Sequence, residues 1–256
     1  MEELITELVA EQDYLDESIR DTPEERWSAQ SPADGWLMRD CISHLADLDN
    51  TAAIIAETGE YPEGDRRSGN GVLAAAQVDA RYLSIPELLE RWRKSRARLA
   101  AALAPLDARD RLPWAGNTMS VRSFTTARLM EAWSHGLDAI ETAGVTPVDS
   151  DRLKNIAHIG YATRSFAYTN RDLEPNEEPL RVELDAPSGA RWTWGPEDAA
   201  NRISGTASDF ARVVTQRIHY SDTNLEYTPG AAEEFLTIAQ AFAGPTGAGR
   251  PPSDEG

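Results

Sequence analysis

The sequence predicts a mainly α protein, in which an N-terminal four-helix bundle is followed by a small α/β domain. Two observations support this fold class. Apolar residues recur every three or four positions over four long segments before Pro147, which is the period of an amphipathic helix. Beyond Pro179 the period falls to two, as in a half-buried strand. We therefore assign residues 1–147 to the bundle, 148–243 to the α/β domain, and 244–256, with four Gly and three Pro, to a disordered tail.

The first half of the bundle is expected from residues 2–20 and 38–57. Residues 2–20 place Leu4, Leu8 and Leu15 on one helical stripe. Residues 22–25 have the form of a helix start, but the Pro and Gly residues of 31–35 limit it to a short turn.

The second half of the bundle begins after residues 60–82, which we interpret as a loop with some helix. Ser84 and Glu87 form a capping box that opens a third helix, and this helix ends at Pro105. A fourth helix is expected over residues 123–142. Four amphipathic helices in sequence are what an up-down bundle needs.

The remainder of the chain alternates helix and strand. A helix is expected over residues 151–169, and two further helices over 207–217 and 230–242. Residues 180–184 and 191–194 alternate in polarity on either side of a Pro-Ser-Gly turn, which predicts a β-hairpin, and residues 202–205 are typical of a strand end.

The charge balance excludes several classes of protein. The chain has 43 acidic and 25 basic residues in 256, for a net charge of −18. A nucleic-acid partner, or an anionic membrane surface, requires a positive footprint. No segment approaches the ~20 apolar residues of a membrane helix, and the acidic N-terminus is unlike a signal peptide. We therefore expect a cytoplasmic protein with a small-molecule substrate, no nucleic-acid partner and no membrane; no heptad seam indicates its oligomeric state.

Three residues form a candidate metal site. Glu131 and His135 are four positions apart, so both lie on one face of the fourth helix. His44 lies midway along the second helix and can face them across the bundle. Two imidazoles and one carboxylate leave a tetrahedral zinc ion with an open position, as in catalytic sites. Iron, nickel and copper accept similar ligands, so the spacing leaves the metal open.

The neighbours of these histidines allow two interpretations. Asp47 and Asp138 follow His44 and His135 by three positions, where they could orient the imidazoles or instead pair with arginines. Cys41, the single cysteine, could be a ligand or nucleophile, but a small buried residue is the favoured reading. The five basic residues within 91–98 are expected to pair with acids on a solvated face.

Two segments resemble a known family. Gly35-Trp36, Arg39-Asp40 and His44-Leu45 resemble the signature of the DinB-like metalloprotein superfamily. Residues 130–138 are similar to the partner segment in its mycothiol-dependent maleylpyruvate isomerase branch.

The resemblance implies a bundle that binds a divalent metal, typically zinc, through His44, Glu131 and His135. It also implies a sterol-carrier-like C-terminal domain, whose arginine reaches toward the metal cleft. Arg217 is our match for that arginine as a catalytic residue, and Arg212 is the alternative match and a candidate for cofactor binding. Residues 217–223 depart from the isomerase pattern and are more similar to an uncharacterised actinobacterial subgroup of this branch.

Three functions follow from these features. In the first, the metal binds mycothiol as thiol cofactor or cosubstrate for isomerisation or thiol transfer on a small electrophile. In the second, a metalloenzyme carries out hydrolysis, isomerisation or cyclisation in secondary metabolism without a thiol. In the third, the protein is a non-catalytic module that binds an apolar ligand.

Overall fold

The computed structural model describes residues 1–62, 82–114, 117–247 and 249–253. The chain divides into two compact units, Met1–Pro147 and Val148–Gly256. Among the described residues, no helix combines the length and the apolar character needed to cross a membrane.

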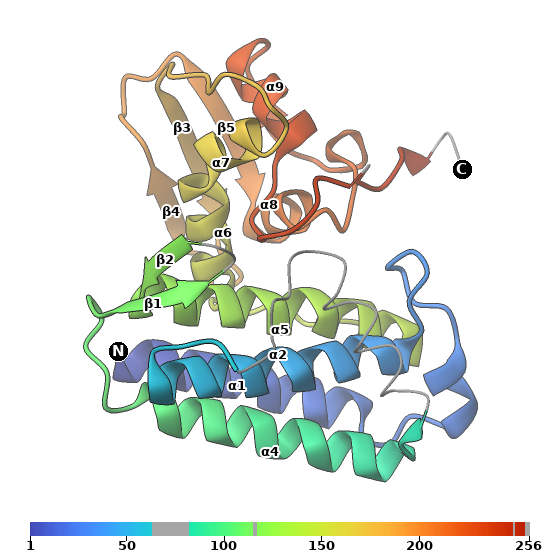
Figure 1. Cartoon of the computed structure of the whole chain (residues 1–256). Coiled ribbons are helices and arrows are strands. Elements are labelled where there is room, and N and C mark those ends of the chain that lie inside the picture. The colour runs from blue at the N-terminus through green and yellow to red at the C-terminus, as the bar shows by residue number, and fades with distance from the viewer. Residues whose placement is uncertain (63–81, 115–116, 248, 254–256) are drawn as a thin grey trace. The chain divides into compact units, whose positions relative to one another are not determined.

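In its described residues, the first unit is a bundle of four long helices (Figure 1). These are α1 (Glu2–Ile19), α2 (Met38–Thr58), α4 (Ile85–Leu103) and α5 (Val121–Ala143). Helix α2 packs most extensively against α4, and α1 against α5. A short 3-10 helix, η1 (Glu24–Ser28), occupies the predicted turn after α1. The predicted loop over 60–82 lies almost entirely outside the described residues.

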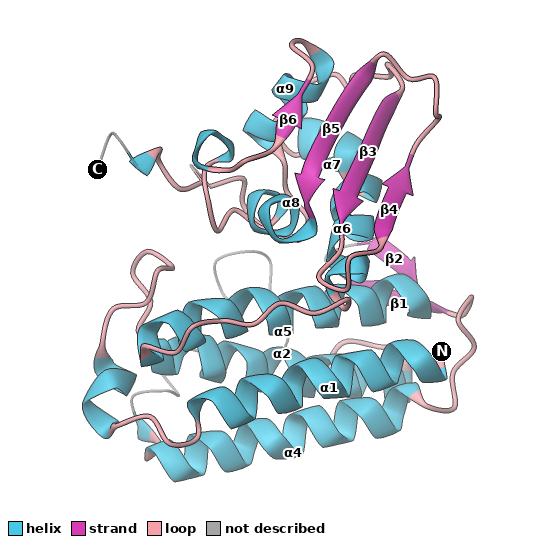
Figure 2. Cartoon of the chain, turned by 180° about the vertical axis from the view of Figure 1, so that it is seen from behind, coloured by secondary structure: helices cyan, strands magenta, loops and turns pink. Residues whose placement is uncertain are grey.

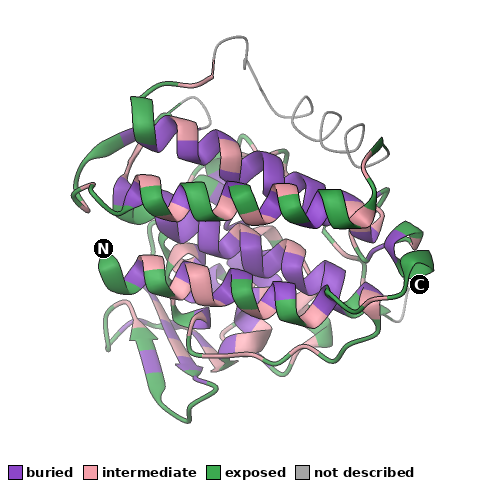
Figure 3. Ribbon diagram, turned by 90° about the horizontal axis from the view of Figure 1, so that it is seen from below, coloured by how far each residue is buried: buried purple, intermediate pink, exposed green. Residues whose placement is uncertain are grey.

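The core of the bundle explains the observed periodicity. Leu15 and Ile19 of α1 pack with Ile42 of α2 and Ile140 of α5 in one buried cluster. Helices α2 and α5 are buried over most of their length, whereas α1 and α4 each expose one side (Figure 3). Functional side chains on α2 and α5 are therefore expected to lie inside the bundle rather than on its surface.

The basic run on α4 forms ion pairs between helices. Arg93 donates two hydrogen bonds to Asp16 of α1, at 2.6 and 2.8 Å, and Arg96 adds a third at 2.8 Å. Arg98 binds Glu57 of α2 at 2.6 Å. These arginines pair with acids as predicted, and their pairs join α4 to both neighbouring helices.

A hairpin that the sequence pattern did not predict precedes α5. Strands β1 (Arg111–Trp114) and β2 (Asn117–Ser120) are antiparallel, with Leu112 opposite Met119. The polar residues after Pro105 were interpreted only as the end of the preceding helix, so no strand was predicted there. The available signal was the alternation of Leu112 and Trp114, which are the two buried residues of β1.

The second unit contains a four-stranded mixed sheet in the order β4-β3-β5-β6 (Figure 2). Strands β3 (Leu180–Asp185) and β4 (Arg191–Trp194) form the predicted hairpin. Strand β5 (Asn201–Thr206) runs parallel to β3, and β6 (Glu226–Tyr227) is antiparallel to β5. The mainly α fold with a small α/β unit is thus confirmed.

The helices of the second unit are shorter than predicted. The single helix expected over 151–169 is two helices, α6 (Leu153–Ala162) and α7 (Arg164–Thr169), because Thr163 departs from helical angles. Helix α8 (Ala207–Val214) and the 3-10 helix η2 (Tyr220–Asp222) precede α9 (Ala231–Ile238).

The C-terminal segment makes hydrogen bonds in its described part. The carbonyl of Thr246 accepts from Arg171 and Gln216, and Ser253 donates to Asp222. Disorder of residues 244–256 stays a prediction, as do the domain limits.

Candidate metal centre

The structure brings His44, Glu131 and His135 together inside the bundle. His44 comes from α2, and Glu131 and His135 lie one turn apart on α5. The Oε2 atom of Glu131 is 3.7 Å from Nε2 of His44 and 3.5 Å from Nε2 of His135. One potential ligand atom from each residue lies within 4.8 Å of the other two.

These separations suit metal ligands better than hydrogen-bond partners. A nitrogen and an oxygen that share a hydrogen bond lie about 2.7–3.2 Å apart. Ligands bound to zinc at about 2.0–2.2 Å in a tetrahedron are separated by about 3.4 Å. The two distances from Glu131 exceed the first range and lie close to the second, so the three side chains fit a divalent metal.

The protonation states of His44 and Glu131 are also those of metal ligands. Burial lowers the pKa of His44, so its imidazole is neutral at physiological pH. Burial raises the pKa of Glu131, but His135, His44 and Arg128 outweigh it and hold the pKa well below its usual range. A neutral imidazole and an ionised carboxylate are the forms that bind metal.

The two aspartates three positions after the histidines differ in their contacts. Asp138 Oδ2 lies 3.8 Å from His135 Nδ1, on the side of the ring that faces away from Glu131. Asp47 instead pairs with Arg91 of α4. Asp138 therefore lies near the imidazole, as the first interpretation requires. Asp47 pairs with an arginine, as the second interpretation requires.

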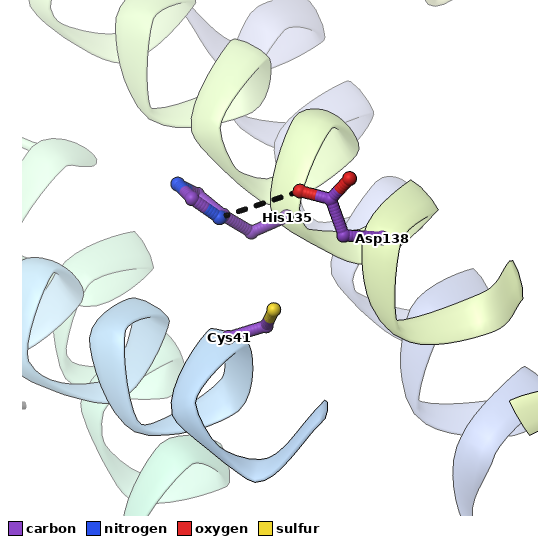
Figure 4. Close-up of side chains that lie close together, drawn as sticks. All are labelled: Cys41, His135 and Asp138. Atoms are coloured by element: carbon purple, nitrogen blue, oxygen red, sulfur yellow. Dashed lines mark ion pairs between the residues drawn. The ribbon is translucent and has the colours of Figure 1, made fainter. Parts of the chain in front are cut away.

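Cys41 lies beside the same edge of His135 (Figure 4). Its thiol, His135 and Asp138 each offer a ligand atom within 4.8 Å of the other two, so they form a second group that shares His135. Cys41 is fully buried, and its sulfur contacts Ser31 Oγ at 3.8 Å. The buried position agrees with the favoured reading of Cys41 as a small core residue.

Two side chains near the site were not singled out from the sequence as functional. The indole of Trp36 stacks on the ring of His135 and meets the ring of His44 edge-on, with both centroid distances at 5.2 Å. Arg128 is 2% exposed, and its guanidinium lies 3.9 Å from the ring centre of Trp114. The Gly35-Trp36 motif was the available sequence signal for Trp36. No motif or spacing indicated a role for Arg128.

Arg217 and Arg212 belong to the second unit. Arg217 follows α8, and its Nη1 donates to the carbonyl of Thr215 at 2.6 Å. Arg212 pairs with Asp149 at 3.8 Å and donates to Ser208 Oγ at 3.3 Å. Their assigned roles in catalysis and cofactor binding stay predictions.

The fold and the donor set define a class: helical-bundle proteins with two histidines and a glutamate on facing helices, followed by a small α/β unit. The chain belongs to the mycothiol maleylpyruvate isomerase family. The family model described as "Mycothiol maleylpyruvate isomerase N-terminal domain" matches residues 8–140. A second model, "Wyosine base formation", matches residues 176–225 in the second unit.

Relatives and solved structures extend this similarity over nearly the whole chain. Two uncharacterised proteins, from two strains of Mycobacterium tuberculosis, are each 41% identical over 96% of this chain and 97% of their own. Crystal structures of the mycothiol-dependent maleylpyruvate isomerase and of a mutant of it share the fold, with TM-scores of 0.59 and 0.60. They are 18% identical to this chain, and each match covers 90% of it and 93% of the solved chain.

Proposed function

We propose that this protein is a divalent-metal-dependent enzyme, with zinc as the expected metal and mycothiol as thiol cofactor or cosubstrate. It would isomerise a small electrophilic substrate or transfer the thiol to it, as a cytoplasmic protein without a nucleic-acid partner. One observation carries the proposal: Glu131 lies 3.7 and 3.5 Å from the two imidazoles, which are ligand separations. Membership of the mycothiol maleylpyruvate isomerase family supports the choice of thiol.

Each residue has a part in this proposal. His44, Glu131 and His135 would hold the metal and leave one position for a further ligand. A metal held there supplies Lewis acidity, which lowers the pKa of a bound thiol. The nucleophile would come from the cofactor, because Cys41 is fully buried. Arg217, or alternatively Arg212, would bind a carboxylate of the substrate or cofactor through its guanidinium.

A second candidate is a metalloenzyme that uses no thiol. The departure of residues 217–223 from the isomerase pattern favours it, because this segment contains the arginine assigned to substrate binding. This enzyme would keep the same three ligands and differ in its cofactor and substrate.

The metal is tested by elemental analysis of the full chain, purified without chelator. We expect one equivalent of metal in the wild type and loss of metal in His44→Ala and His135→Ala. His158→Ala is the matched control, because His158 is exposed on α6 of the other unit. Wild-type protein that neither retains zinc nor binds added zinc would overturn both metalloenzyme proposals and leave the binding module.

The thiol is tested by calorimetry of the zinc-loaded protein with mycothiol. Binding in the wild type that is lost in His135→Ala, followed by turnover of maleylpyruvate or another small electrophile, supports the first proposal. Absence of binding at millimolar thiol would contradict it in favour of the second.

A further inference from the structure

The imidazoles of the candidate metal centre lack the usual means of orientation. A metal-binding histidine ordinarily donates its second ring N–H to a carboxylate or carbonyl, which fixes the ring. Here the Nδ1 atoms of His44 and His135 are both buried without a hydrogen-bond partner among the described residues. The 3.8 Å from His135 Nδ1 to Asp138 is beyond hydrogen-bond distance. The contacts that the structure does show at both rings are aromatic.

Trp36 contacts both rings from a single side chain. Its indole is nearly parallel to the ring of His135, at 15°, and nearly perpendicular to that of His44, at 78°. The two imidazoles also contact each other edge-on, with centroids 4.6 Å apart. Offset-stacked and edge-to-face arrangements are the favourable geometries for aromatic pairs at these separations.

The loop that carries Trp36 is fixed by its own backbone. The carbonyl of Trp36 accepts from the amide of Ser31 at 2.7 Å and from the side chain of Gln30 at 2.9 Å. Its amide donates to the carbonyl of Ala33 at 3.1 Å. Gly35 closes this turn with φ +73°, a conformation that favours glycine. A tight turn thus fixes the backbone of Trp36, and the residue is only 8% exposed.

We propose that Trp36 is a positioning residue that orients His44 and His135 for metal binding, in the place of hydrogen bonds to Nδ1. The inference rests on the proposed metal site. Trp27 serves as a comparison, because it belongs to the same buried cluster but has no ring contact with either histidine. A purely structural tryptophan would affect stability alone, whereas a positioning residue also alters the geometry of the ligands.

The test compares Trp36→Leu and Trp36→Phe with the matched control Trp27→Leu in the full chain. Zinc affinity is measured by competition with a chromophoric chelator, and ligand geometry by the visible absorption spectrum of the cobalt-loaded protein. We expect Trp36→Leu to lose about tenfold or more in zinc affinity and to change the cobalt spectrum, by analogy with the loss of other orienting partners. Trp36→Phe, which retains a flat ring, should recover most of both, and Trp27→Leu should keep both while losing thermal stability.

A measurement on the metal-free protein separates this inference from the proposed function. Stacking on Trp36 shifts the imidazole proton resonances of His135, and Trp36→Leu should remove that shift while Trp36→Phe retains part of it. Unchanged imidazole resonances in Trp36→Leu, or unchanged zinc affinity and cobalt spectrum, would overturn the role of Trp36. Failure of the wild type to bind any metal would instead overturn the proposed function. The resonances of the metal-free protein would still show whether Trp36 orients the ring of His135. If Trp36→Leu does not fold, Trp36→Met takes its place, because it also removes the aromatic ring, and unchanged imidazole resonances, or unchanged zinc affinity and cobalt spectrum, in that variant would overturn the inference.

Discussion

Replacing Asp49 by Asn is expected to stabilise the bundle at neutral pH. Asp49 lies on α2, is 2% exposed, and accepts a hydrogen bond of 3.0 Å from the side chain of Gln12. Burial raises the pKa of Asp49 from 3.8 to about 7, and the nearby cation Arg128 opposes this only in part. At neutral pH the solution is therefore near the pKa of Asp49, so part of the folded protein carries this buried group as a charged carboxylate.

The sign follows from the two pKa values of Asp49. Its folded value is the higher, so the folded state binds more protons than the unfolded state and stability falls as pH rises from about 4 to about 7. A difference of about 3 pKa units corresponds to about 4 kcal/mol in total. Of this total, about 3 kcal/mol is lost between pH 5 and pH 8, because part of the loss has already occurred at pH 5.

Urea unfolding of the two proteins, followed by circular dichroism between pH 5 and pH 8, measures this effect. The difference between variant and wild type cancels the pH dependence that other groups share, and we expect it to grow by about 3 kcal/mol in favour of Asp49→Asn. Asp16→Asn is the control: although burial raises the pKa of Asp16, Arg93 and Arg96 lower it overall. That variant should be less stable than the wild type by a constant amount over this range, since its stabilisation is lost only at lower pH. A pH-independent difference for Asp49→Asn would refute the reasoning.

Three further predictions concern packing and metal. Gly195→Ala should prevent folding of the second unit, because an added Cβ would clash with the backbone carbonyl oxygen of Leu180. Gly189→Ala, with a similar positive φ but open space around the added Cβ, should cost only about 1–2 kcal/mol in urea unfolding. Gly160→Ala should cost about 1–3 kcal/mol, because the new methyl meets the Val214 side chain at 2.7 Å, and Val214→Ala in the same chain should recover part of it. Zinc at about 100 times its Kd should stabilise the wild type by about 2.7 kcal/mol in thermal unfolding, and a chelator should reverse this; no zinc-dependent shift would contradict the metal site.

Much of the bundle follows from the sequence because its helices bury one face. The stripe through Leu4, Leu8 and Leu15 is the buried face of α1. The capping box predicted at Ser84 is present, with its amide donating to Glu87 at 2.8 Å. The i, i+4 spacing of Glu131 and His135 similarly determines that their side chains meet, because both features depend on contacts within a single helix.

Features that depend on contacts between distant segments could not be predicted in this way. Asp47 and Asp138 have identical spacing from a histidine, yet Asp47 pairs with Arg91 because α4 packs against that side of α2. The parallel pairing of β3 with β5 is another example, since alternation identifies a strand but not its partner. The stacking of Trp36 on His135 also joins a loop to a helix about 100 residues away, which no local pattern encodes.

The contrast between Asp49 and Glu131 shows why composition alone cannot identify a ligand in so acidic a chain. Both carboxylates lie inside one bundle, and desolvation raises the pKa of each. The pKa of Asp49 ends at about 7, whereas two imidazoles and Arg128 hold that of Glu131 well below its usual range. A buried carboxylate that stays ionised beside the neutral imidazole of His44 has its charge available for a cation. A carboxylate that is half protonated at neutral pH would first have to release a proton. Glu131 is therefore the carboxylate of this pair suited to bind a metal at neutral pH, and Asp49 is the one expected to make stability depend on pH.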